Sequence, residues 1–131
     1  MLRLVNEARS QGYRCGDAGL HPPVPPLALD ARLSLAAQKH SADMRARGGA
    51  GSHSGSDGSR AADRVGREGY NPLWLGENTY WNLSAEPRPG EAMNFWLLSP
   101  AHCRNLMSPN FSDLGVGKAG GYWTLVFARP L

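Results

Sequence analysis

Three ionisable side chains have the residue types and settings of a binding or catalytic site. His53 lies in the Gly- and Ser-rich segment AGSHSGSDGS, which cannot bury an imidazole by itself. His102 lies in SPAHCRNLM, in the first turn of an expected helix, where the positive end of the helix dipole lowers the pKa of an imidazole. Glu77 lies in LGENTYW, at the start of an expected strand. Neutral imidazoles and a carboxylate suit metal binding, ligand binding or acid–base chemistry.

The remaining candidates have simpler interpretations. His40 lies on the apolar stripe of an expected helix, which favours a buried structural histidine, and His21 in a Pro-rich loop is assigned no role. Glu77 could also have a purely structural role, as a hydrogen-bond partner of a neighbouring loop. Asn105 could reach toward the site or only hold the turn that follows it. The sequence contains no G-x-S-x-G, Walker, HExxH or paired-cysteine motif, so residue chemistry alone leads no further.

The two cysteines, Cys15 and Cys103, lie far apart and form neither a CxxC pair nor a metal-ligand spacing. They could be two buried free thiols or one disulfide. Both lie beside polar, turn-like residues, in YRCGD and AHCRN, whereas inert thiols usually lie inside apolar runs. This setting favours a disulfide, and a disulfide indicates an oxidising compartment.

Composition narrows the function classes. The 131 residues are enough for one domain with its own core, and we expect a single domain over residues 1–131. The net charge is +3, but the arginines are scattered among acids rather than gathered in a stripe with aromatics, so nucleic-acid binding is not expected. The nearest cluster, Arg60, Arg64 and Arg67, is interpreted as a solvated helix face. No apolar run approaches the roughly 20 residues of a membrane span.

Periodicity and capping residues predict the elements that must position these side chains. Helices are expected over 2–11, ending at Gly12; over 31–47, capped by Asp30; over 60–69, capped by Ser59; over 91–99; and from Pro100 onward, capped by Ser99. An irregular strand is expected within 70–83 and a hairpin from 114–119 and 122–128. The Pro- and Gly-rich segment 15–29 is expected to form an ordered loop without a helix. These elements predict an α+β fold in layers.

Seven segments, in order and with compatible spacing, resemble the CAP (SCP-like) domain family, most closely its short bacterial branch. They are LVNEAR, PPLALDARLSLAAQKHSADM, HSGSDGSRAADRVGREGY, GEN, WLLSPAHCRNLM, F..LGVG and YWTLVFA, which together span most of the chain from Leu4 to Ala128. The resemblance implies a three-layer α-β-α sandwich with a small, mostly antiparallel sheet. It also implies an exported protein, secreted or periplasmic. MLRLVNEARSQG is not a signal peptide, so this location presumes that one has been removed.

In that family a cleft carries two histidines and two acidic residues, and in several members the histidines hold a divalent cation, often zinc. By resemblance His53 is the first histidine and Glu77 the first acid. This sequence departs from the eukaryotic pattern at two positions: Ser99 stands where the second acid would be, and Tyr122 where the late-strand histidine would be. The bacterial branch offers a histidine from its SP-x-H-x-x-N turn, here His102.

We therefore expect a cleft lined by His53, Glu77, His102, Asn105 and Tyr122. His53 and His102 would be the metal ligands and Glu77 the candidate catalytic residue. Because zinc prefers four ligands, this set predicts weak zinc binding or none.

Three functions remain open at this point. The first is a monomeric binding module for an unknown small molecule, lipid or cell-envelope component. The second is a metal-assisted hydrolase with Glu77 as its base. The third is a lipid or sterol carrier, for which Trp74, Tyr80 and Trp81 would have to line a groove instead of belonging to the core or its rim. We favour the binding module over the enzyme.

Overall fold

The computed structural model describes residues 1–84 and 86–131. The helices are α1 (Leu2–Gln11), η1 (Gly16–Ala18, a 3₁₀ turn), α2 (Ala31–Arg47), α3 (Ala61–Arg67), α4 (Pro89–Leu98) and α5 (Pro100–Met107). The strands are β1 (Tyr13–Arg14), β2 (Leu20–His21), β3 (Ala28–Leu29), β4 (Pro72–Trp81), β5 (Asp113–Ala119) and β6 (Tyr122–Pro130).

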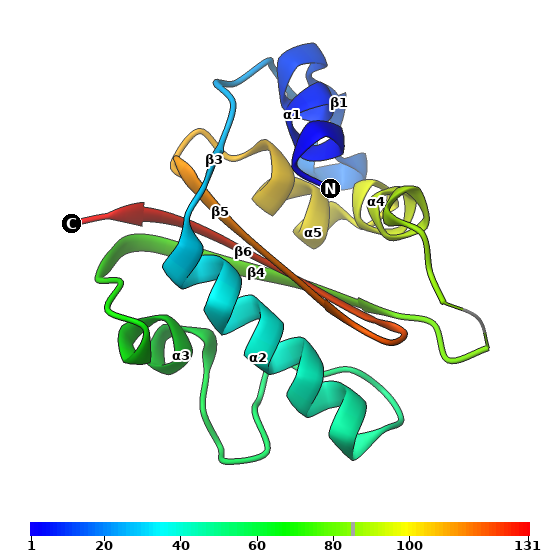
Figure 1. Ribbon diagram of the computed structural model, residues 1–131. Helices are drawn as coiled ribbons and strands as arrows, with labels where there is room; N and C mark the ends of the chain where they lie inside the picture. Colours follow the sequence, from blue (N-terminus) through cyan, green and yellow to red (C-terminus); the bar gives the residue numbers. More distant parts are fainter. Residues whose placement is uncertain (85) are drawn as a thin grey trace.

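Four strands form the central sheet in the order β3-β5-β6-β4. β6 pairs antiparallel with both β4 and β5, and only the short β3 adds in parallel, against β5. Helices α2 and α3 cover one face of this sheet, and α1, α4 and α5 cover the other (Figure 1). The expected three-layer α-β-α sandwich with a mostly antiparallel sheet is confirmed.

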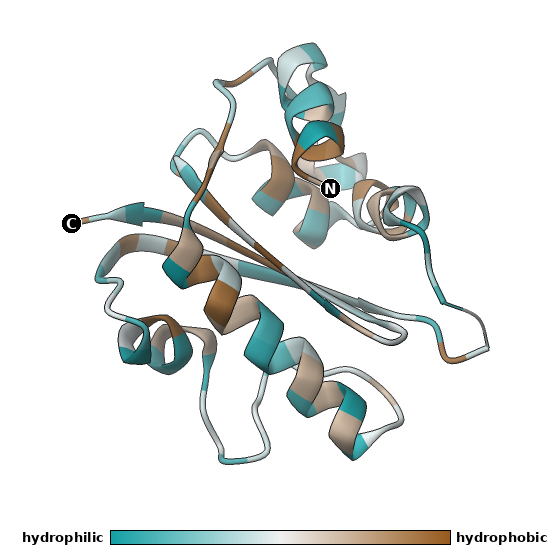
Figure 2. Cartoon of the chain, viewed as in Figure 1, coloured by the Kyte–Doolittle hydropathy of each residue, from teal (hydrophilic) through white to brown (hydrophobic). Residues whose placement is uncertain are grey.

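The largely apolar sequence of β6 explains why helices cover both faces of the sheet. Residues 122–128 are all buried, although successive side chains of a strand point to opposite faces. Two hydrophobic clusters result, one under α1, α4 and α5 and one under α2 and α3. Figure 2 shows hydrophobic residues along the central strands, between the two helical layers. A strand buried on both faces is apolar along nearly its whole length, and here Thr124 alone interrupts the run, with its hydroxyl 2.7 Å from Oγ of Ser41.

Local capping sets the start of two helices. The Asp30 carboxylate accepts the backbone N–H groups of Arg32 and Leu33 and so begins α2, as the sequence predicts. The prediction that Ser59 caps α3 is wrong, because the N-cap residue is Arg60. The backbone N–H of Arg60 donates a hydrogen bond to the Asp63 carboxylate. Ser59 lies one residue earlier and is buried.

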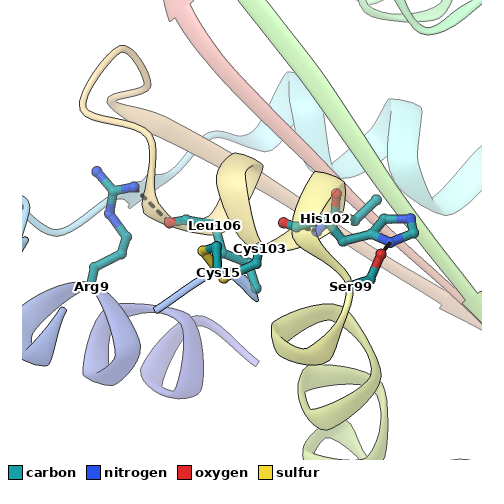
Figure 3. Close-up of a disulfide and its surroundings, with 7 residues drawn as sticks. Arg9, Cys15, Ser99, His102, Cys103 and Leu106 are labelled. Atoms are coloured by element: carbon teal, nitrogen blue, oxygen red, sulfur yellow. Dashed lines mark hydrogen bonds between the residues drawn. A yellow bond between two sulfur atoms is a disulfide. The ribbon is translucent and has the colours of Figure 1, made fainter. Parts of the chain in front are cut away.

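A disulfide joins Cys15 to Cys103, with 5.5 Å between their Cα atoms, so the favoured pairing is confirmed. It connects the N-terminal arm to α5 (Figure 3). The arm was expected to lack helix, but the 3₁₀ turn η1 follows Cys15 directly. Arg9 ties the same region to α5 by donating to the backbone carbonyls of Leu106 and Ser108. Burial lowers the pKa of Arg9 to about 10.

Candidate functional site

Glu77 is the centre of a hydrogen-bonded group at the outer edge of the sheet. It lies on β4, the edge strand opposite β3, and its side chain is 5% exposed. Its Oε1 is 2.8 Å from Nδ1 of His53, and its Oε2 accepts a 2.8 Å hydrogen bond from Nη2 of Arg64. Because a carboxylate can only accept, the His53 ring carries its proton on Nδ1, which leaves Nε2 for other partners.

Arg64 is a site residue that sequence reasoning missed. It was interpreted as part of a solvated row, and this is wrong because its side chain is 8% exposed. Besides Glu77, the guanidinium donates to the backbone carbonyls of His53 and Ser59. Arg64 therefore fixes both the carboxylate and the backbone of the loop that carries the histidine. No local signal in the sequence distinguishes it from Arg60 and Arg67, which are exposed as expected.

Two further side chains hold the loop before and around His53. Nε2 of His40 lies 2.6 Å from the backbone oxygen of Ser52, so it carries the proton, and the His40 side chain is buried as predicted. The hydroxyl of Tyr122, which is also buried, donates a 2.6 Å hydrogen bond to the carbonyl of Gly49. Tyr122, a predicted cleft residue, thus has its hydroxyl on the backbone of the loop that precedes His53.

An asparagine pair connects Glu77 to the helix that carries His102. Asn105 donates to the Asn78 side chain at 2.9 Å and to the backbone carbonyl of Glu77 at 3.4 Å. Asn78 in turn donates to the backbone carbonyl of His102 at 3.2 Å, and it is fully buried. Sequence reasoning missed Asn78, although it follows Glu77 directly, because neighbouring strand residues point to opposite faces. Asn105 thus holds the strand edge rather than presenting its amide to a ligand.

His102 lies on the opposite helical layer from the His53 loop. Its Nδ1 is 2.8 Å from Oγ of Ser99, the residue that precedes α5, and its ring lies 5.7 Å from that of Phe95 between centroids. Neighbouring residues on a helix project about 100° apart. Accordingly, Cys103 points to the disulfide and His102 points away from it (Figure 3).

The pKa values of the histidines shift in different directions. The hydrogen bond to Glu77 raises the pKa of His53 above its ordinary value. Burial, and then the charge of His53, lower the pKa of His102. The direction predicted for His102 is confirmed, with burial rather than a helix dipole as its main cause. Burial also lowers the pKa of His40.

The donor atoms present do not fit a zinc centre. Both carboxylate oxygens of Glu77 already accept hydrogen bonds, one of them from an arginine that would repel a cation. Only ring nitrogens of His53 and His102 remain, whereas zinc takes four ligands in structural sites and three from the protein in catalytic ones. Within residues 1–84 and 86–131, no group of three or more His, Cys, Asp or Glu side chains could hold a metal ion.

A family model described as the cysteine-rich secretory protein family, CAP, matches residues 2–127. The chain belongs to this family. Its CAP domain is 32% identical over 104 residues to the uncharacterized protein YkwD of Bacillus subtilis, a match that covers 78% of this chain and 39% of YkwD. The match to residues 2–127 confirms the resemblance that the sequence motifs indicated.

Solved CAP-type structures share the fold. An extracellular SCP-domain protein of Bacillus anthracis superposes with a TM-score of 0.82 at 30% identity, covering 98% of this chain and 38% of that protein. An outer surface protein of Borrelia burgdorferi superposes with a TM-score of 0.79 at 14% identity, and the match covers 99% of this chain and 90% of that protein. This chain thus spans well under half of YkwD and of the B. anthracis protein. In the part of the chain that the structure describes, no helix has the length and apolar character to cross a bilayer.

Proposed function

We propose that this CAP domain is the binding module of an exported protein, secreted or periplasmic, and that His53 and His102 contact its ligand at the open edge of β4. The observation that supports this proposal is that both oxygens of the Glu77 carboxylate accept hydrogen bonds, one from His53 and one from Arg64. Glu77 orients the His53 ring and leaves its Nε2 free, and the His53 side chain is 62% exposed. The neighbours of extracellular and outer-surface origin support export.

The charge states favour an acidic group on the ligand. The raised pKa of His53 favours its protonated form, which presents an N–H donor at Nε2. An acceptor such as a carboxylate or phosphate would satisfy this donor with a charge-assisted hydrogen bond. Acidic lipids and acidic cell-envelope polymers both carry such groups.

Apolar side chains beside His102 support a lipid as a second candidate. On α4, Phe95 is 44% exposed and Leu98 79% exposed. The Phe95 ring lies between His102 and Tyr80, with centroids 5.7 and 5.1 Å away. A lipid could therefore place its headgroup at the histidines and its chain on α4. Trp81 and Trp74 are also partly exposed, as a carrier would need.

A hydrolase is less well supported. The Ser99 hydroxyl and His102 resemble a nucleophile and its base, but they are three residues apart at one helix start. Among the described residues no carboxylate hydrogen-bonds His102 to complete a triad. Both oxygens of Glu77 already accept hydrogen bonds, one from His53 and one from Arg64, so the carboxylate orients these two side chains. The geometry therefore supports binding better than turnover.

Cosedimentation at pH 6 tests the proposal, with purified insoluble peptidoglycan in one arm and phosphatidylglycerol vesicles in the other. We expect the wild type to bind one of them and His53→Ala and His102→Ala to bind it at least about tenfold less, as loss of one hydrogen bond to a charged group implies. His21→Ala is the matched control and should bind like the wild type. No binding in either arm, or binding that both site variants retain, would refute the proposal. Release of soluble fragments that Glu77→Gln abolishes would establish the hydrolase instead.

A further inference from the structure

A hollow of about 250 Å³ lies between α2, α3 and the turn at residues 55–59. His53, Glu77 and His102 do not line this hollow, so it is separate from the candidate site and independent of the proposed function. Arg64 belongs to both places, because it lines the hollow and also holds Glu77. At this volume the hollow is smaller than the roughly 300–1,000 Å³ of sites for drug-sized ligands, and it suits a ligand of one small ring.

The charges that line the hollow cancel. Three are cationic and three are acidic: Lys39, Arg64, Arg67, Asp43, Asp57 and Glu68. An anionic ligand would face three carboxylates, and a cationic ligand would face three positive charges. The hollow therefore gives no net electrostatic preference to either kind of ion.

These side chains are also held in place by one another. Nζ of Lys39 lies 3.0 and 2.9 Å from the two carboxylate oxygens of Glu68. Nη1 of Arg67 donates to Asp57 at 2.7 Å, and the backbone N–H of Ser56 donates to Asp43 at 2.9 Å. Asp43 also lies 3.7 Å from Nη2 of Arg47, and Arg64 pairs with Glu77. Each of the six charged side chains therefore has a partner of opposite sign, and their donors and acceptors are held at fixed positions.

We propose that this hollow binds a neutral polyhydroxylated ligand of the size of one monosaccharide ring. A hydroxyl group both donates and accepts, so it can add to an existing ion pair without disturbing the charge balance. The carboxylates and cationic groups of the lining still have unused lone pairs and N–H groups for this purpose. Ala36 and the aliphatic stems of Lys39 and Arg67 offer apolar surface for the C–H face of such a ring.

Two of the three acids that line the hollow, Asp43 and Asp57, have lowered pKa values. The hydrogen bond from Ser56 lowers the pKa of Asp43, and hydrogen bonds from Ser59 lower that of Asp57. Both acids therefore stay ionised at the pH of ordinary binding measurements. The wall around them is tight, because a Cβ atom on Gly55 would lie 2.5 Å from Oγ of Ser59 and 2.9 Å from Oδ1 of Asp57.

Amide chemical-shift titration of the ¹⁵N-labelled chain with glucose and with N-acetylglucosamine tests the proposal. We expect saturable shifts at the amides of residues 39, 43 and 55–59, with weak affinity. Lys39→Met and Arg67→Met keep the apolar stem but remove the charged donor, and each should weaken binding about tenfold, equivalent to about 1.4 kcal/mol. Arg3→Met is the matched control, because Arg3 forms a comparable exposed ion pair on α1.

The outcomes separate this proposal from the preceding one. Absence of shifts with both sugars overturns it, and so do shifts that Lys39→Met and Arg67→Met leave unchanged while their melting temperatures match the wild type. Stronger shifts with glycine or inorganic phosphate than with either sugar would show that the ligand class is wrong. Shifts confined to the amides near His53 and His102 would concern the candidate site and would contradict a sugar site in the hollow.

Discussion

At the scale of single residues, the Glu77 carboxylate determines how the His53 ring is oriented and protonated. One carboxylate oxygen accepts a hydrogen bond from Nδ1 of His53, and the other accepts a hydrogen bond from the guanidinium of Arg64. The arginine is the buried partner of this group, whereas the imidazole is largely exposed. The same carboxylate thus stabilises the fold through Arg64 and presents a functional nitrogen through His53.

The opposite pKa shifts predict the titration order of the histidines. His53 should titrate above the reference value of about 6.5, and His40 and His102 below it. The His53 contact therefore stabilises the protein at low pH and is lost as pH rises through its raised pKa. Burial of neutral His40 acts in the other direction, since stability is lost as pH falls below about 6.5.

Imidazole ¹H–¹⁵N spectra recorded against pH measure these values directly. Glu77→Gln should lower the pKa of His53, because the hydrogen bond to Glu77 is the main cause that raises it. A His53 pKa that is equal in wild type and Glu77→Gln would contradict the ring–carboxylate contact.

Removal of Arg64 should destabilise the chain strongly. Arg64→Met leaves a buried carboxylate without its cation, which costs about 3 kcal/mol of unfolding free energy. Arg67→Met is the control on the same helix, because its pair with Asp57 is more than half exposed and contributes at most about 1 kcal/mol. Urea unfolding compares the two, and equal losses would mean that Arg64 is not the buried support described above.

Zinc should bind weakly at most, because His53 and His102 offer only two nitrogens. Isothermal calorimetry with zinc chloride should give no saturable heat, or a weak heat that His53→Ala removes. Tight binding of one zinc ion per chain would show that the described donor set is incomplete.

At the scale of elements, α2 lies directly against β5 because β5 lacks side chains where the two meet. A Cβ atom on Gly115 would overlap the backbone of Leu33, and one on Gly117 would overlap the backbone of Ala37. The close approach positions the C-terminal part of α2, where His40 contacts the loop that carries His53. Helix–strand packing thus contributes to the geometry of the site.

Gly115→Ala should therefore force α2 away from the sheet and lower the unfolding free energy by about 1–3 kcal/mol, as overpacking does. Gly66→Ala is the matched control within α3, where the added methyl group meets open space. It should stabilise the chain by up to about 1 kcal/mol through helix propensity. Thermal melts of both variants give the comparison, and a neutral Gly115→Ala would disprove the close packing.

At the scale of the whole molecule, the disulfide joins the N-terminal arm to the helix that carries His102. It closes a loop between residues 88 positions apart. In the chain-entropy model, a loop of this length contributes about 4 kcal/mol by restricting the unfolded chain. Both cysteines are fully buried, so the bond also forms part of the core.

The double variant Cys15→Ser, Cys103→Ser should lose about 4 kcal/mol of unfolding free energy. The wild-type chain should show no reactive thiol when denatured without reductant. Two reactive thiols in that assay, or a double variant as stable as the wild type, would contradict this role.

Much of the architecture followed from local pattern. The sequence predicted the helix over 31–47, the hairpin strands and the largely apolar strand over 122–128, because the spacing of apolar residues indicates which faces are buried. The sequence did not predict the 3₁₀ turn after Cys15 or the N-cap residue of α3. Neighbouring polar residues can each begin such a turn or helix, and the free-energy difference between them is small.

The sequence by itself determined the family and the layered fold, and it singled out His53 and Glu77, which the structure brings within hydrogen-bonding distance. Tertiary structure alone decided that Arg64 pairs with Glu77, that Asn78 joins β4 to α5, and that Tyr122 holds a loop. The physical reason is that hydrophobic spacing records whether a side chain is buried. The partner of a polar side chain depends instead on which distant segments the packed core brings within hydrogen-bonding distance.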